Sequence, residues 1–311
     1  MAGNVLVVKP APGVSQSSLA LIKIFREAGL PEEALSLTFA TVPQIHRMIG
    51  DFRVRGVTFT GSSRAGSAIA ESAGRHLKKV VLELGGSDPF IILPDAPLQD
   101  AIDMAVEGRL HNTGQACIGT KRVIVVGKER GELVLRDMQE GMASLQAGDP
   151  RDSSTTVGPV VSERALLGLL EQIEVAERSG GAVALGGRRI ARPGFYLEPT
   201  ILTNISQTNP ATKQEFFGPV VSLYVVDSEK EAVELANGTE LGLGSSIISK
   251  DVEHAKEIAD KLEVGMVFIN GIAYSSLELP CGRVKNFGKE LSRIGFHEFV
   301  NKKLVRVAKK F

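Results

Sequence analysis

Short apolar runs alternate with amphipathic helical runs along most of this chain of 311 residues. In its first part, residues 5–8, 35–39, 57–60 and 80–84 are predicted to form strands, and residues 15–28 are predicted to form a helix. This alternation is typical of parallel α/β units, in which each helix packs on the sheet formed by its flanking strands. The sequence therefore predicts an α/β fold with a largely parallel sheet.

The same alternation continues after residue 85, with a surface loop over residues 148–159. We expect strands at residues 90–93, 122–126, 220–226, 245–249 and 266–269. Helices are expected at residues 98–110, 131–145, 163–178, 229–237 and 252–262.

Composition narrows the class of protein. The 36 basic residues balance the 36 acidic ones, which argues against a dedicated nucleic-acid partner. No apolar run approaches the roughly 20 residues that span a bilayer, so no membrane role is expected. The two cysteines give no disulfide framework and the chain does not begin like a signal peptide, so we expect a reducing cytoplasm. No metal site is predicted.

A thiol and a carboxylate lie in two glycine-rich segments, Glu83 within residues 82–89 and Cys117 within residues 112–122. A thiolate can attack a carbonyl carbon, and a carboxylate can activate the water that later releases the product. A buried, inert cysteine is the other interpretation of such a residue. The pair alone leaves both interpretations open.

The turn at Gly61 and Ser62 precedes a predicted helix that runs to about Arg75. Backbone N–H groups at such a helix start can face a phosphate. The spacing matches neither the G-x-G-x-x-G fingerprint nor a P-loop, so an ordinary helix start stays possible.

Both glycine-rich segments resemble motifs of the NAD(P)-dependent aldehyde dehydrogenase superfamily: Glu-Leu-Gly-Gly at residues 83–86 and Gly-Gln-x-Cys at residues 114–117. Further motifs of the family follow in collinear order at residues 3–10, 59–66, 215–219, 265–270 and 288–292. Within the family, residues 82–91 and 290–301 are most similar to succinate-semialdehyde dehydrogenases.

The resemblance implies an aldehyde dehydrogenase-like α/β fold, with a partial Rossmann-type cofactor domain and an α/β catalytic domain. Residues 1–85 would be the remainder of the NAD(P)-binding domain, residues 86–286 the catalytic domain with the thiol, and residues 287–311 a C-terminal return and oligomerisation segment. Because family members are usually longer, the resemblance also implies an N-terminally truncated chain. A sheet that lacks its early strands exposes an edge and apolar surface, so we predict poor solubility or association.

The implied activity is NAD(P)-dependent oxidation of a small aldehyde, with succinic semialdehyde as the candidate, to a carboxylate. Cys117 would attack the aldehyde and form a thiohemiacetal and then a thioester, and Glu83 would activate the water that hydrolyses the thioester. The implied cofactor residues are Lys9 at the adenine ribose, Gly61 and Ser62 at the pyrophosphate, Leu84, Glu215 at the nicotinamide ribose, and Phe217 near the ring.

Two of these cofactor positions, and the nearby Pro12, carry further expectations. Pro12 stands where many NAD-preferring members carry a glutamate, so NADP is expected to bind at least as well as NAD. Taken alone, Lys9 could equally be a solvated lysine, and Phe217 could equally be a core residue.

One loop, residues 279–290, departs from the family pattern. Cys281 replaces an aromatic residue, Arg283 replaces a glycine, and a Ser-Gly pair is missing. An arginine is costly if the position needs a positive φ. Cys281 is expected to be a small buried filler, with a second reactive thiol as the alternative. Arg283 and Lys121 are candidates for binding a distal substrate carboxylate, although both are expected at the surface.

Residues 298–308 resemble the family strand that pairs across subunits, which predicts a homodimer or tetramer. Two alternatives to the dehydrogenase remain. The chain could be a catalytically impaired, truncated remnant that acts as a binding or oligomer subunit. It could also be a cofactor-free thiol esterase that uses Cys117.

Overall fold

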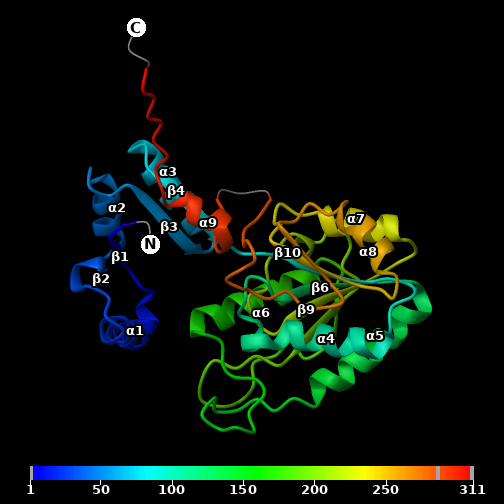
Figure 1. Ribbon diagram of the computed structural model, residues 1–311. Helices are drawn as coiled ribbons and strands as arrows, with labels where there is room; N and C mark the ends of the chain where they lie inside the picture. Colours follow the sequence, from blue (N-terminus) through cyan, green and yellow to red (C-terminus); the bar gives the residue numbers. More distant parts are fainter. Residues whose placement is uncertain (1–2, 285–287, 309–311) are drawn as a thin grey trace.

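The computed structural model describes residues 3–284 and 288–308 of the chain. Figure 1 shows two lobes: a small lobe that carries strands β1 to β4, and a large lobe built on the sheet of strands β5 to β11. The predicted α/β fold with a mainly parallel sheet is confirmed.

The sheet of the large lobe has seven strands in the order β11-β10-β5-β6-β9-β8-β7. All neighbours are parallel except β7, which runs antiparallel to β8. Every residue of β5 and β6, near the centre of the sheet, is buried, which explains the apolar runs at residues 90–92 and 123–126. The strands are β5 (Asp88–Ile92), β6 (Thr120–Val126), β7 (Ala182–Leu185), β8 (Thr200–Thr203), β9 (Val220–Val226), β10 (Gly244–Ile248) and β11 (Met266–Ile269).

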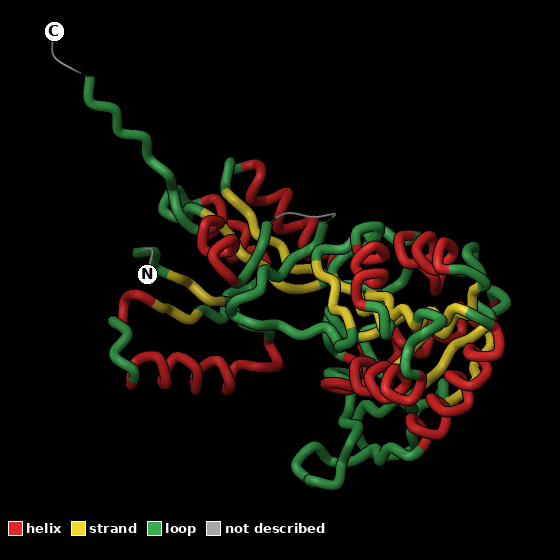
Figure 2. The backbone as a smooth tube through the Cα atoms, turned by 45° about the vertical axis from the view of Figure 1, so that its right-hand side comes forward, coloured by secondary structure: helices red, strands yellow, loops and turns green. Residues whose placement is uncertain are grey.

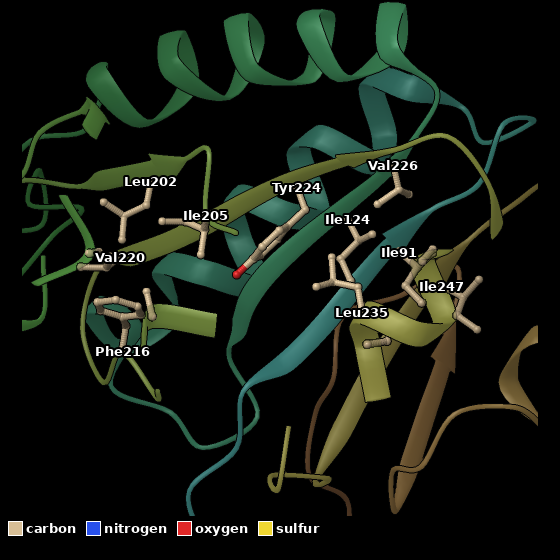
Figure 3. Packing of buried hydrophobic residues seen from close by; sticks show 14 of the residues in the cluster. Ile91, Ile124, Leu202, Ile205, Phe216, Val220, Tyr224, Val226, Leu235 and Ile247 are labelled. Atoms are coloured by element: carbon tan, nitrogen blue, oxygen red, sulfur yellow. The ribbon is translucent and has the colours of Figure 1, made fainter. Parts of the chain in front are cut away.

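Helices cover both faces of this sheet. On one face α4 (Leu98–Leu110) and α5 (Lys128–Ala143) pack on Phe90 and Ile92, whereas Ile91 between them faces the other side, as strand geometry requires. The second face is covered by α6 (Glu163–Arg178), α7 (Glu229–Asn237) and α8 (Val252–Ala259). Figure 3 shows residues of this second core, among them Ile91, Ile124, Tyr224 and Ile247.

The small lobe is far less buried. Its strands form two separate parallel pairs, β1 with β2 and β3 with β4. All three residues of β1 are exposed, and α1 buries only Ile22. The elements are β1 (Leu6–Val8), α1 (Ser15–Glu27), β2 (Leu35–Leu37), α2 (Val42–Gly50), β3 (Gly56–Gly61), α3 (Ser63–Arg75) and β4 (Lys79–Leu84), with short 3-10 turns η1 (Pro12–Val14) and η2 (Glu32–Ala34).

The C-terminal part of the chain returns to the small lobe. Helix α9 (Ser292–Glu298) lies beside β3 and β4 in Figure 1, and Lys79 forms a 3.0 Å ion pair with Glu298. After this helix the backbone leaves both lobes as an extended arm (Figure 2). Within the single chain, described residues 299–308 form no strand, so pairing across subunits stays a prediction.

Most predicted elements are present, with ends shifted by a few residues; the helix expected at 131–145, for example, begins at Lys128. Sequence analysis missed α2, β7, β8 and α9. Among the described residues, no helix is both long enough and apolar enough to cross a membrane.

Candidate active site

The thiol of Cys117 lies on a loop between the 3-10 turn η3 (His111–Gly114) and β6. Asn112, Thr113 and Gly114 have φ angles of 51°, 56° and 73°, in the left-handed region that non-glycine residues rarely adopt. A Cβ atom on Gly114 would lie 2.1 Å from the carbonyl oxygen of Gly218. The buried side chain of Arg109 donates a hydrogen bond to the Gly114 carbonyl. The loop is therefore fixed by close backbone contacts.

Lys121, the second residue of β6, binds this loop through its side chain. Its side chain is 1% exposed, so the expectation that Lys121 is a surface residue was wrong. The Nζ atom donates hydrogen bonds to the carbonyl oxygens of Ala116, at 2.7 Å, and Cys117, at 2.6 Å. Burial raises the pKa of the half-buried Cys117 thiol, and the positive charge of Lys121 lowers it.

Glu215 approaches the same lysine from the loop before β9. Its Oε1 atom accepts a 3.0 Å hydrogen bond from the Gly86 backbone amide and lies 3.4 Å from Lys121 Nζ. A Cβ on Gly85 would lie 1.7 Å from Glu215 Oε2, so the glycine pair of the link between β4 and β5 makes room for this carboxylate. The Glu215 side chain is 20% exposed and can still be reached from solvent.

Glu83, near the end of β4, is 6% exposed. The Cys281 thiol lies 3.9 Å from its Oε2 atom, and Oε1 accepts no hydrogen bond from any described residue. Burial, followed by the charge of Glu290, raises the pKa of Glu83 to about 7, and Lys289 opposes this shift. A carboxyl group with a pKa in this range can act as a general base near neutral pH.

Cys281 lies beside the candidate base Glu83. Burial, followed by the charges of Glu83 and Cys117, raises the pKa of the Cys281 thiol to about 12, so this half-buried group stays a neutral, weak donor. Its side chain thus touches a candidate catalytic group, which the expectation of a simple buried filler did not include.

Arg283 is 3% exposed, so its predicted surface position was also wrong. Its pKa is lowered by burial and raised by the charges of Glu215, Asp88, Glu83 and Cys117, which places the guanidinium among the candidate site residues. Among the described residues of this loop, Gly282 and Gly288 have positive φ angles, of 143° and 82°, and Arg283 does not, so Arg283 does not carry the backbone strain considered from the sequence.

Asp88, at the start of β5, is a buried group that sequence analysis did not identify. It is 3% exposed, and burial raises its pKa to about 7 while Lys121 opposes the shift. Arg122, which follows Lys121 in β6, is also buried. Its side chain donates hydrogen bonds to the carbonyls of Ser87, Leu235 and Ala236. The sequence signal for these residues was the pair Lys121–Arg122 in an otherwise apolar strand, because buried charges require partners.

The candidate cofactor residues Gly61, Ser62 and Leu84 lie together because β3 and β4 pair in parallel, with Gly61 opposite Leu84 and Thr60 opposite Glu83. The Ser62 hydroxyl caps α3 by accepting a 3.3 Å hydrogen bond from the Ala65 amide. Leu84 packs on α3, since a Cβ on Gly66 would lie 2.5 Å from Leu84 Cδ2. The predicted turn therefore lies next to the strand that carries Glu83.

Lys9 and Phe217 lie outside the strand pair of β3 and β4. Lys9 is exposed directly after β1, on a different strand pair from Gly61 and Leu84. Phe217 is 44% exposed, whereas its neighbour Phe216 is 1% exposed. The alternative in which Phe217 is a core residue was wrong, because Phe216 fills the core instead.

The model of the "Aldehyde dehydrogenase family" matches residues 1–305 of this chain. A succinate-semialdehyde dehydrogenase [NADP(+)] of Deinococcus radiodurans is 45% identical over 306 residues, which are 98% of this chain and 64% of that protein. A probable succinate-semialdehyde dehydrogenase [NADP(+)] of Synechocystis is 40% identical and covers 99% of this chain and 68% of that protein. The chain thus spans about two thirds of the length of these relatives.

Solved structures show the same similarity. The succinic semialdehyde dehydrogenase of Streptococcus pyogenes in complex with NADP+ superposes with a TM-score of 0.95 at 40% identity, and covers 99% of this chain and 68% of that one. The NAD+ complex of an aldehyde dehydrogenase from Bacillus cereus gives a TM-score of 0.92 at 31% identity, with 96% and 61% covered.

Proposed function

Because this chain belongs to the aldehyde dehydrogenase family, we propose that it carries the nucleophile, the base and part of the cofactor site for NAD(P)-dependent oxidation of an aldehyde. The observation that supports this most strongly is the arrangement around Cys117. Its loop is held by a buried cation, and the same cation contacts Glu215, which can be reached from solvent.

The proposed reaction begins when the Cys117 thiolate adds to the aldehyde carbon and forms a thiohemiacetal. Loss of a hydride from that carbon leaves a thioester on Cys117. Glu83 then takes a proton from water, and the resulting hydroxide attacks the thioester, releases the carboxylate and restores the thiol. The pKa of about 7 suits Glu83 to this role, since the base must be ionised before it can accept the proton.

The cofactor would accept the hydride. The residues present fit such a group: Gly61 and Ser62 open α3 at the phosphate side, and Leu84 lies beside them. Glu215 can exchange its Gly86 contact for ribose hydroxyls, and the exposed ring of Phe217 is free to pack against the cofactor. Lys9 is proposed at the adenine ribose.

We further propose that NADP binds at least as well as NAD. Pro12 places no carboxylate near the expected position of the 2′-phosphate, and the relatives described above are named as NADP(+) enzymes. The proposed substrate is succinic semialdehyde, on the basis of the names of the same relatives. We also propose that the protein forms a homo-oligomer and that it lies in the cytoplasm.

The test measures reduced cofactor by its absorbance, with the purified chain, succinic semialdehyde, and either NAD or NADP. We expect NADP reduction that disappears in Cys117→Ala and is retained when the exposed residue Glu240 is changed in Glu240→Gln. A folded chain that hydrolyses activated esters through Cys117 without cofactor reduction would favour the thiol esterase. A folded chain without either activity would favour the impaired subunit.

A further inference from the structure

The ammonium of Lys121 contacts residues on both sides of the candidate site. All three of its N–H groups have an acceptor at hand: the Ala116 carbonyl at 2.7 Å, the Cys117 carbonyl at 2.6 Å and Glu215 Oε1 at 3.4 Å. Two of these acceptors belong to the loop that carries the thiol, and the third is the candidate ribose-binding carboxylate. One buried ammonium therefore joins the nucleophile to the cofactor side of the site.

The ammonium is surrounded by opposing charges. Burial lowers the pKa of Lys121, and the neighbouring carboxyl groups of Asp88 and Glu215 oppose this shift. The other charged or titratable groups that act on Lys121 or on Cys117 come from α4 and from the C-terminal loop; they are Arg109, Arg283 and Cys281.

The same charges act on the thiol. Lys121 stabilises the Cys117 thiolate, and Asp88 and Glu215 destabilise it. Because Glu215 lies against the lysine, it offsets part of the positive charge that would otherwise act on the thiol. Any movement of Glu215 away from Lys121 leaves more of that charge for Cys117.

We propose that Lys121 is a positioning residue that fixes the Cys117 peptide and divides its positive charge between the thiol and Glu215, so that the reactivity of Cys117 depends on this pair. The inference rests on the proposed function for the role of Cys117 as the nucleophile. Its test needs neither cofactor nor turnover, so an inactive chain can still support it.

The experiment uses the presence of only two cysteines in the chain. In a Cys281→Ala background, Cys117 is the single thiol, and its second-order rate with iodoacetamide is measured from pH 6 to pH 10. Lys121→Met should slow alkylation at neutral pH by about three- to tenfold and move the midpoint to higher pH, because the thiol loses a cation that lowers its pKa. Lys121→Arg should restore most of the rate, since it keeps the charge.

Glu215→Gln should act in the opposite direction and speed alkylation by about threefold or more, because Lys121 is no longer shared with an anion. The exposed Lys128 provides a matched control, and Lys128→Met should leave the profile unchanged. An unchanged profile in folded Lys121→Met would overturn the proposal. If Lys121→Met does not fold, Glu215→Gln decides the outcome, since unchanged or slower alkylation there would also overturn it.

Discussion

The large and small lobes use the same alternation of strands and helices, but they differ in how completely they bury it. In the large lobe, β5 and β6 are buried along their whole length and helices cover both sheet faces. In the small lobe, β1 is exposed throughout, with Leu6 at 53% and Val7 at 55%.

Because of this difference, some parts of the candidate site are held by a buried core and others are not. The Cys117 loop, Lys121 and Glu215 are held by a core that the described chain completes itself. The first strand pair presents apolar side chains and unpaired strand edges, which a stable protein normally covers. We therefore expect the reacting groups to be better ordered than the proposed adenine-ribose site at Lys9.

Hydrogen exchange tests this contrast most strongly. Amides of β6 should open only with a free energy of about 5 kcal/mol or more, whereas those of β1 should exchange through openings of about 1–2 kcal/mol. Mass spectrometry of peptides from the exchanged protein gives both values in one experiment. Equal protection of β1 and β6 would break the comparison and show that another surface covers β1.

Two glycines with positive φ provide the next test. Gly114→Ala should lower the free energy of unfolding by about 3 kcal/mol or more, because its Cβ would lie 2.1 Å from the Gly218 carbonyl oxygen. Gly29→Ala in the small lobe should cost about 1 kcal/mol, since its φ is 89° but no atom lies within 4 Å of the added carbon. Urea unfolding measures both, and equal losses would contradict the tighter packing assigned to the Cys117 loop.

Two carboxyl groups should give opposite pH dependence. Because burial raises the pKa of Asp88 to about 7, the folded state keeps its proton longer than the unfolded state, and stability falls as pH rises from about 4 to 7. Asp88→Asn should remove a loss on the order of 2–4 kcal/mol from this range of the unfolding curve.

The matched control in the small lobe is Asp51, whose pKa the hydrogen bonds from Arg53 hold below its usual value. Its stabilising contribution is present at neutral pH and lost in acid. Because Asp51 is exposed to solvent, Asp51→Asn should have little effect on the unfolding curve.

A slope between pH 4 and 7 that Asp88→Asn leaves unchanged would contradict the burial of the Asp88 carboxyl group.

The smallest effect is expected where the two lobes meet. Cys281→Ala should raise the pH midpoint of Glu83-dependent thioester hydrolysis by a few tenths of a unit, because the ionised carboxylate loses a weak donor at 3.9 Å. Hydrolysis of an acyl group placed on Cys117 by an activated ester reports this step without cofactor. Cys281→Ser should restore the midpoint, and a shift of equal size in Cys281→Ser would indicate a steric cause.

Sequence analysis predicted the strands and helices that have a clear apolar pattern or a capping residue. Strands β5, β6 and β9 each carry a run of apolar residues, and Ser162 caps the start of α6 by accepting a hydrogen bond from the Ala165 amide. Strand β7 and strand β8 have four residues each, too few for a clear period. Helix α2 did carry a usable signal, because Thr41 and Gln44 form a capping box.

The candidate site divides in the same way. Motif resemblance identified Glu83, Cys117 and Glu215, but could not place Lys121 or Arg283, because their burial depends on partners distant in sequence. Lys121 is buried against Glu215 and Asp88, and Arg283 lies among charges contributed by three separate segments. A charged residue was therefore assigned to the surface wherever its compensating charge was far along the chain.

The return of α9 to the small lobe affects the order in which the two lobes can fold during synthesis. The Asn4 side chain donates a 2.7 Å hydrogen bond to the carbonyl of Phe299, and the Thr58 hydroxyl donates one to Glu290. Asn4 and Thr58 thus cannot complete these contacts until Phe299 and Glu290 have been synthesised. The large lobe is synthesised later but can finish folding earlier. The newly made small lobe therefore stays incompletely folded for longer, with apolar surface exposed.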